Sequence, residues 1–178
     1  MERRVEALVV GGGLAGLSAA YFLARRGLRP WVLEREAPLS CTSDKSTEAY
    51  RLFWPGDEDL AALVRESLDL LSPFAGVARP NRRGYLYVGR LEALEAMALE
   101  APHAGPLRVH REAATYPKEA ASGLDLLLPG ALGEVFPYLG HLRGLGGLHV
   151  RPAGWLSPQG LGMALLGGLR ALGGRLVF

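Results

Sequence analysis

A glycine-rich turn between an apolar stretch and an amphipathic stretch opens the chain. Residues 5–10 are mostly apolar and β-branched, which predicts a buried strand that runs into the glycines at 11–13. From residue 14 to residue 26 apolar side chains recur at helical spacing, and Gly27 suits the end of that helix. Residues 29–34 predict a second strand. Strand, helix and strand within about 30 residues predict a right-handed parallel βαβ unit and therefore an α/β fold.

Three glycines of this turn have the spacing Gly11-x-Gly13-x-x-Gly16. Gly11 permits the sharp turn, Gly13 lets a pyrophosphate approach the backbone, and Gly16 lets the helix pack closely on the strand. The amides of Leu14 and Ala15 have no intrahelical acceptor, so they are expected to point at the phosphates. The pattern predicts a dinucleotide site, and the alternative is a glycine-rich turn that binds nothing.

An acidic residue and a hydroxyl-rich loop follow the second predicted strand. Glu34 ends that strand, where a carboxylate can accept hydrogen bonds from both hydroxyls of a ribose. An acid at this place disfavours a 2′-phosphate, so NADP is not expected. In the loop at 39–51, hydroxyls can donate to phosphate oxygens and Lys45 can add a positive charge. The alternative interpretation is a solvated surface loop.

Periodicity recurs at later places in the chain. Residues 57–73 predict an amphipathic helix with acids at its start, and residues 91–99 predict a shorter one. A third helix is expected over 157–172, where a serine N-cap precedes a proline, and residues 175–178 predict a third strand of the nucleotide sheet. Residues 101–123 contain several prolines and are expected to form loop and irregular strand.

Several stretches of the chain carry a likeness to a known group of enzymes. They are residues 9–20, 26–27, 32–35, 39–51, 82–88, 136–139, 147–150 and 153–158. Together they resemble the FAD-dependent oxidoreductases of the D-amino acid oxidase, glycine oxidase and sarcosine oxidase superfamily. The resemblance covers nearly the whole chain but only about the first half of a family member. It implies a Rossmann-type FAD-binding fold with an inserted substrate-domain segment, and FAD as the cofactor.

The resemblance also implies roles for single residues. The backbone of Leu14 and Ala15 is expected to bind the pyrophosphate, and Glu34 with Arg35 the adenosine ribose and its surroundings. The hydroxyl residues expected along the diphosphate and the ribityl–flavin side are Thr42, Ser43, Ser46 and Thr47.

The implied reaction is oxidation of a C–N bond of an amino acid or amine by hydride transfer to flavin. Arg51 is a candidate for binding a substrate carboxylate, and Tyr85 and Tyr87 for orienting the substrate and forming an apolar wall. Packing and surface pairing are the alternative roles of these three side chains. No general base is assigned.

The expected domain organisation follows from the resemblance. Residues 1–78 form the FAD-binding part, 79–150 the start of the substrate domain, and 151–178 a return helix with the third nucleotide-sheet strand. The nucleotide sheet is expected to be incomplete at its C-terminal end, which leaves an unpaired edge and uncovered apolar surface. We therefore expect a truncated or split N-terminal portion that is inactive alone, with a complementing C-terminal half or a homo-oligomer as partner.

Composition narrows the remaining classes. The 20 basic and 18 acidic residues nearly balance, which argues against a nucleic-acid surface, and glycines interrupt the uncharged runs, which argues against a membrane span. A single cysteine, Cys41, excludes an internal disulfide and fits a cytoplasmic location. No metal site is expected, because the histidines lack ligand spacing and are interpreted as surface or hydrogen-bonded residues; they are His103, His110, His141 and His149.

Three hypotheses about function remain open. The first is a flavin-dependent amine or amino-acid oxidoreductase that is active only when completed. The second is a non-catalytic nucleotide-binding remnant or subunit that holds the ADP part of FAD. The third is an NAD-binding dehydrogenase domain, which the Glu34-Arg35 pair and the hydroxyl-rich loop disfavour.

Overall fold

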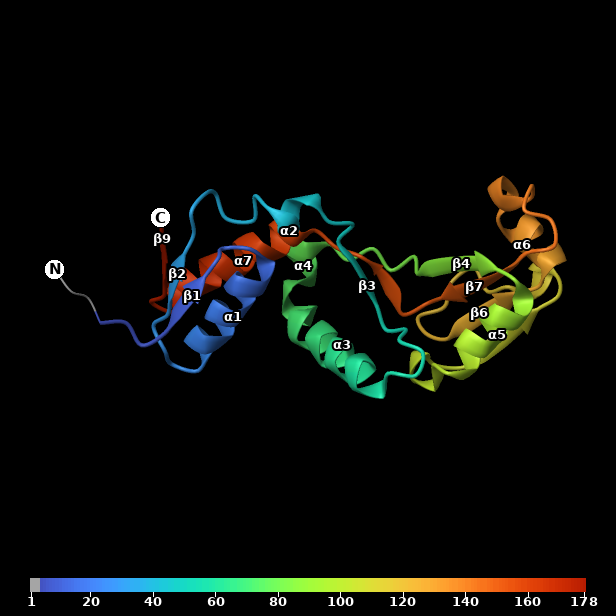
Figure 1. Cartoon of the computed structure of the whole chain (residues 1–178), viewed down its shortest axis with the longest axis horizontal. Helices are drawn as coiled ribbons and strands as arrows, with labels where there is room; N and C mark the ends of the chain where they lie inside the picture. The colour runs from blue at the N-terminus through green and yellow to red at the C-terminus, as the bar shows by residue number, and fades with distance from the viewer. Residues whose placement is uncertain (1–3) are drawn as a thin grey trace. The chain divides into compact units, whose positions relative to one another are not determined.

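A computed structural model describes residues 4–178, which form two compact units of mixed α/β structure (Figure 1). The first unit contains the chain up to Glu48, together with Pro73–Pro80 and Leu156–Phe178. The second unit contains Ala49–Ser72 and Asn81–Trp155. The contacts therefore group Ala49–Ser72 with the second unit, whereas the sequence placed this stretch in the FAD-binding part.

The first unit is built on a parallel three-stranded sheet. Its strands are β1 (Leu8–Val10), β2 (Trp31–Leu33) and β9 (Arg175–Val177), in the order β1-β2-β9. Helix α1 (Leu14–Arg25) connects β1 to β2, and α7 (Pro158–Ala171) leads into β9. This arrangement confirms the predicted βαβ unit and the predicted third strand beside it.

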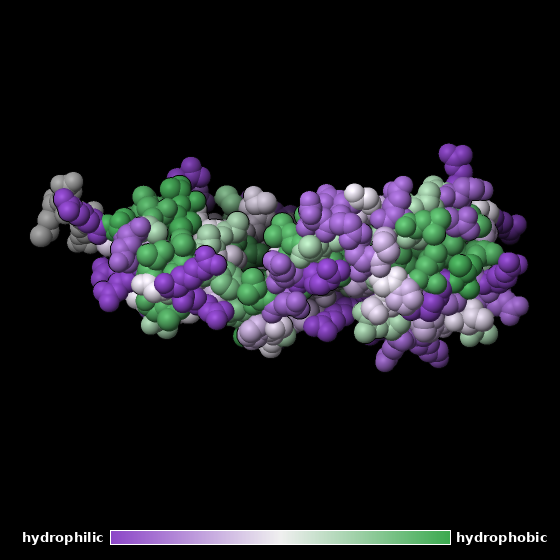
Figure 2. Space-filling model, turned by 90° about the horizontal axis from the view of Figure 1, so that it is seen from below, coloured by the Kyte–Doolittle hydropathy of each residue, from purple (hydrophilic) through white to green (hydrophobic). Residues whose placement is uncertain are grey.

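Both long helices of this unit pack on one face of the sheet. Leu17 of α1, Val32 of β2 and the leucines at 161, 165 and 169 of α7 are fully or almost fully buried there. Side chains alternate between the two faces of a strand. Leu8 and Val10 point to the other face and are 52% and 82% exposed, and Figure 2 shows apolar residues gathered on the surface beside the N-terminal end of the chain. Parallel sheets are normally covered by other elements on both faces. In this unit the face that carries Leu8 and Val10 is left uncovered.

The second unit contains a four-stranded mixed sheet in the order β4-β7-β6-β5. Its strands are β4 (Tyr85–Gly89), β5 (Leu107–His110), β6 (Leu124–Leu127) and β7 (Gly146–Val150). Strands β5 and β6 are parallel, and the other two pairs are antiparallel. Helix α5 (Leu91–Leu99) packs on one face, and α6 (Pro129–Val135) on the other. A separate antiparallel pair joins β3 (Ala49–Arg51) to β8 (Ala153–Trp155).

The remaining elements are short apart from one helix. They are α2 (Thr42–Lys45), α3 (Glu58–Leu71), α4 (Ala75–Ala78) and the 3₁₀ turns Ser72–Phe74, Pro102–Ala104, Ala113–Thr115 and Pro137–Leu139. Asp57 caps α3 by accepting from the Leu60 amide at 2.9 Å, and Ser157 caps α7 by accepting from the Gly160 amide at 3.0 Å. No helix among residues 4–178 combines the length and the apolarity that crossing a membrane requires.

The structure corrects the sequence analysis at a few elements. The stretch 39–51, expected to be a loop, contains α2 and β3, and the stretch 101–123 contains the regular strand β5. Helix α6 was not predicted. Each difference arises where pairing or packing with a distant segment outweighs weak local preference.

Candidate functional site

The glycine turn brings α1 directly against the end of β1. Gly11 has φ +103°, a conformation that side-chain-bearing residues rarely adopt, and its amide donates to the Leu33 carbonyl at 2.8 Å. A Cβ atom on Gly16 would lie 2.0 Å from the Gly11 carbonyl oxygen. Both glycines are therefore required for the turn and for close packing of the helix on the strand. The turn leaves the N-terminus of α1 at the carboxyl edge of the parallel sheet.

The first amides of α1 have no acceptor within the helix, so they can donate to an oxygen from elsewhere. The Leu14 amide donates to Ser43 Oγ at 2.9 Å, and Gly13, which precedes the helix, has no side chain to cap it. Ser43 lies on α2, which is held near α7 because Gln159 Nε2 donates to Asp44 Oδ1 at 3.0 Å. Since the serine oxygen accepts from Leu14, its own hydrogen can donate to a phosphate oxygen. At the place predicted for the diphosphate, the Ser43 oxygen therefore already accepts a hydrogen bond from the N-terminus of α1.

The carboxylate of Glu34 is oriented by three backbone amides. Oε2 accepts from Gly12 at 2.6 Å, and Oε1 accepts from Arg35 at 2.7 Å and from Glu36 at 3.0 Å. The hydrogen bonds from Glu36 and Gly12 lower the pKa of Glu34, so the group is ionised at neutral pH. A carboxylate offers about four acceptor positions, so this one can still accept from a ribose hydroxyl. The turn and the acid therefore fit an adenosine diphosphate.

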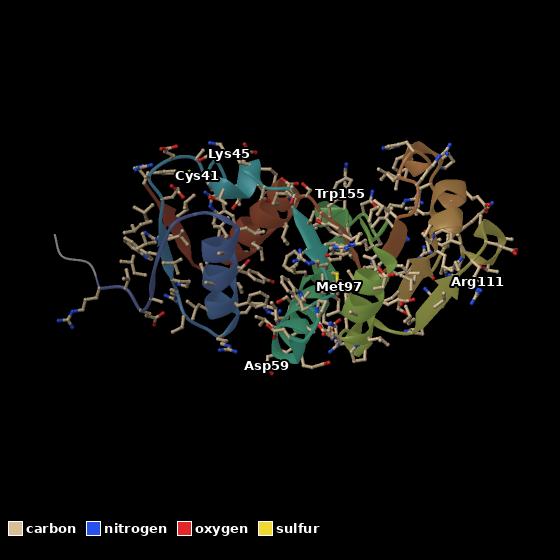
Figure 3. The ribbon with its side chains drawn as sticks, turned by 45° about the vertical axis from the view of Figure 1, so that its right-hand side comes forward. Cys41, Lys45, Asp59, Met97, Arg111 and Trp155 are labelled. Atoms are coloured by element: carbon tan, nitrogen blue, oxygen red, sulfur yellow. The ribbon has the colours of Figure 1, made fainter. Side chains whose placement is uncertain are left out.

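The other side chains predicted to bind the nucleotide are exposed or have partners of their own. Arg35 is exposed and pairs with Glu36 at 3.1 Å. Ser46 Oγ accepts from the Glu48 amide at 3.0 Å. Thr42, Ser46 and Thr47 are exposed on or beside α2. Cys41 and Lys45, at the two ends of this helix (Figure 3), are exposed as well. Their roles toward FAD stay predictions.

The three residues predicted for substrate lie in the second unit. Arg51 ends β3, and Tyr85 and Tyr87 lie on β4, with their ring centroids 6.2 Å apart. Phe53 is fully buried, with its ring centroid 5.4 Å from that of Tyr87. Burial raises the pKa of the Tyr87 hydroxyl, and the nearby charge of Arg51 opposes that rise. Arg51 and Tyr87 are therefore neighbours, as a shared binding surface requires.

The comparison with protein families decides the assignment. A family model described as FAD dependent oxidoreductase matches residues 6–178. The chain belongs to the FAD-dependent oxidoreductase family. FAD is accordingly its cofactor. The roles of the glycine turn, the first amides of α1 and the Glu34 carboxylate toward the ADP part of FAD stay predictions.

Individual proteins resemble the chain over nearly all of its length. Mitochondrial dimethylglycine dehydrogenase from Mus musculus is 25% identical over 188 residues, which cover 98% of the chain and 19% of that protein. The structure of L-proline dehydrogenase from P. horikoshii matches with a TM-score of 0.78 and 18% identity, covering 99% of the chain and 44% of the other. Glycine oxidase from Geobacillus kaustophilus matches with a TM-score of 0.76 and 18% identity, covering 99% and 47%. The chain spans less than half the length of each.

The second unit of this flavoprotein also contains a buried charged cluster that the sequence analysis missed. Asp125 on β6 is fully buried, and its Oδ1 accepts from Arg108 Nε at 2.6 Å and from His110 Nε2 at 2.9 Å. Its Oδ2 accepts from Arg108 Nη2 at 3.1 Å and from Arg151 Nε. Burial alone would raise the pKa of Asp125, but the bonds from Arg108, His110 and Arg151 outweigh burial and lower it to about 2. The signal in the sequence was a lone acid within the apolar run Leu124–Leu128.

The same cluster fixes the connection between the parallel strands β5 and β6. Arg108 Nη2 donates to the Ser122 carbonyl at 3.1 Å, and Arg151 Nη2 donates to the Pro117 carbonyl at 2.7 Å. Parallel strands are usually joined through a helix, whereas this crossover has only a 3₁₀ turn. The buried charges therefore replace a crossover helix in holding the connection to the sheet.

His149 on β7 completes the cluster as a neutral imidazole. Its Nε2 donates to the Arg83 carbonyl at 2.8 Å, and its Nδ1 accepts from the Tyr116 hydroxyl at 2.6 Å. Burial lowers the pKa of His149 below its usual 6.5, and the bond to Arg83 only partly opposes this. The interpretation of His110 and His149 as hydrogen-bonded residues is confirmed.

Acidification is expected to destabilise the protein in two steps. Because the pKa of His149 is lower in the folded chain than 6.5, the unfolded chain binds protons first, and the free energy of unfolding falls below about pH 6.5. The pKa of Asp125 drops from 3.8 to about 2 on folding, so its contribution is complete above pH 4 and is lost toward pH 2. Urea unfolding followed by circular dichroism at each pH measures both steps. In the variant His149→Gln the upper step should vanish and the lower one remain; an unchanged upper step would exclude His149 as its source.

Proposed function

We propose that this chain contributes the FAD-binding site and part of the substrate site of an oxidoreductase that oxidises the C–N bond of an amino acid or amine. The observation that supports it most is the N-terminus of α1, which donates to an oxygen, next to the ionised Glu34 carboxylate in a chain of this family. The names of the three similar proteins carry dimethylglycine, proline and glycine, which are all amino acids with a C–N bond. When bound, flavin supplies a hydride acceptor for the carbon next to nitrogen, which leaves an imine that water hydrolyses.

The residues of the first unit act on the cofactor by binding and orientation. The Ala15 amide and the positive end of α1 stabilise the diphosphate charge, and the Leu14 amide acts through Ser43 Oγ, to which it donates. Ser43 donates its hydroxyl to a phosphate oxygen, and Glu34 accepts from a ribose hydroxyl. Three backbone amides hold the Glu34 carboxylate in place, so little conformational entropy is lost when the ribose binds.

The residues of the second unit act on the substrate. Among residues 4–178 no carboxylate forms an ion pair with Arg51, so its guanidinium is available for the carboxylate of an amino acid. Tyr85 and Tyr87 pack against the core with their rings and offer an apolar wall beside that charge.

A flavin titration tests the proposal. The purified chain should bind FAD, and Glu34→Ala should weaken binding about tenfold to a hundredfold because a hydrogen bond to a charged group is lost. Glu36→Ala changes an exposed acid two residues away and should bind FAD like the wild type. Because the chain supplies only part of the substrate site, anaerobic glycine, proline or dimethylglycine should bleach the visible flavin absorbance once a complementing half is added. A chain that binds no FAD, or that binds it equally well without Glu34, would contradict the proposed cofactor site.

A second candidate is a subunit that holds the ADP part of FAD without completing a reaction. The bare apolar face of the parallel sheet supports it, with Leu8 and Val10 exposed. In this form another polypeptide, a complementing half of the kind that relatives contain in one chain, covers that face. FAD that binds but is not bleached by any of the three amino acids would favour this candidate. The cytoplasmic location and the truncated or split origin stay predictions.

A further inference from the structure

The guanidinium of Arg51 lies over the ring of Trp54, which is not one of the predicted substrate residues. Its Cζ atom is 4.2 Å from the ring centroid of Trp54, well within the range of a cation–π contact. Trp54 Nε1 also donates to the Arg51 carbonyl at 3.1 Å. The same indole therefore contacts both the side chain and the backbone of Arg51.

Trp54 is itself held in place by a distant histidine and by its buried neighbour Phe53. Its backbone amide donates to His103 Nε2 at 3.2 Å, so the imidazole hydrogen is on Nδ1, which faces Glu58 Oε1 at 3.4 Å. The side chain of His103 is almost fully buried. Phe53, the residue before Trp54, is anchored in the core. The indole is thus a fixed support, whereas a free arginine side chain samples many rotamers.

We propose that Trp54 is a positioning residue: its indole holds the Arg51 guanidinium in one orientation, ready to bind a substrate carboxylate. This inference rests on the proposed function, because it assumes that Arg51 receives that carboxylate. An arginine stacked on a ring keeps its planar edge of N–H donors free for two parallel hydrogen bonds. Fixing the arginine before binding lowers the entropy lost on binding.

The test uses the whole chain, labelled with ¹⁵N, and follows the Nε–Hε signal of Arg51, which is identified by its loss in Arg51→Lys. In the wild type this signal should shift on titration with propionate and not with the uncharged propionamide. Trp54→Leu should lower the order parameter of Arg51 Nε and weaken propionate binding about tenfold. Trp54→Phe keeps a ring face and should restore most of the binding. Trp155→Leu, which removes a half-exposed indole from β8 (Figure 3), should bind like the wild type.

Two outcomes would overturn the inference in different ways. If propionate shifts the Arg51 signal and Trp54→Leu binds it as well as the wild type, Trp54 has no positioning role and the proposed function is untouched. If propionate leaves the wild-type signal unchanged, Arg51 is not a carboxylate receptor, and both this inference and the proposed substrate contact are wrong.

Discussion

Replacing Asp125 with alanine is expected to unfold the second unit or leave it barely stable. The carboxylate is fully buried and accepts from Arg108, His110 and Arg151, so its loss leaves the buried Arg151 without a counter-charge. Removing one partner of such a pair costs about 3–5 kcal/mol. Domains have only about 5–15 kcal/mol of stability in total. Urea denaturation followed by circular dichroism measures the loss.

A matched substitution in the same unit controls for the loss of an aspartate. Asp69 is exposed near the C-terminal end of α3, and Asp69→Ala should change the free energy of unfolding by less than about 0.5 kcal/mol. Asp125→Asn keeps the shape and removes the charge, and should be nearly as damaging as alanine. If Asp125→Ala unfolded at the same urea concentration as Asp69→Ala, the buried cluster would not stabilise the unit as we infer.

Replacing Gly16 with valine is expected to weaken FAD binding strongly. Even a Cβ atom there would lie 2.0 Å from the Gly11 carbonyl oxygen, a backbone atom that cannot move aside alone. Helix α1 must then shift away from β1, which displaces the amides of Leu14 and Ala15 from the diphosphate. Overpacking of this kind costs about 1–3 kcal/mol of stability. FAD affinity should fall about a hundredfold, since hydrogen bonds to a charged group are lost.

Flavin fluorescence titration checks this expectation against a second glycine of the same unit. Gly167 on α7 has open space around its Cα, and Gly167→Ala should leave FAD affinity unchanged and stabilise the helix by about 0.5–1 kcal/mol. A Gly16→Val protein that is folded by circular dichroism and binds FAD like the wild type would show that the turn does not form the cofactor site.

Much of the glycine turn and of the helices could be predicted because their signals are local. The requirement for glycine at 11 and 16 arises within one turn, and the periodicity that predicts α1 spans only its own twelve residues. The caps of α3 and α7 are likewise set by Asp57 and Ser157, each acting three residues ahead. Local sterics and helix capping need no partner from elsewhere, so single-sequence reasoning reaches them.

The second unit was harder to predict because its important contacts join distant residues. Asp125 gains its role only when Arg108 and Arg151 arrive from two other parts of the chain. Strand β3 forms because β8, about a hundred residues later, pairs with it, which also places Ala49–Ser72 in this unit. The stack of Trp54 on Arg51 depends in turn on His103.

The amino-acid sequence by itself determined the βαβ unit, its glycine turn and the acid that follows it, since backbone sterics and helical periodicity act over a few residues. Only the tertiary structure decided how Ser43 meets the Leu14 amide, how Asp125 is paired and what supports Arg51. The roles of charged and polar side chains depend on the residues that lie next to them in the folded protein. These neighbours are set by tertiary packing, and the desolvation and pairing energies that follow arise only in the folded protein.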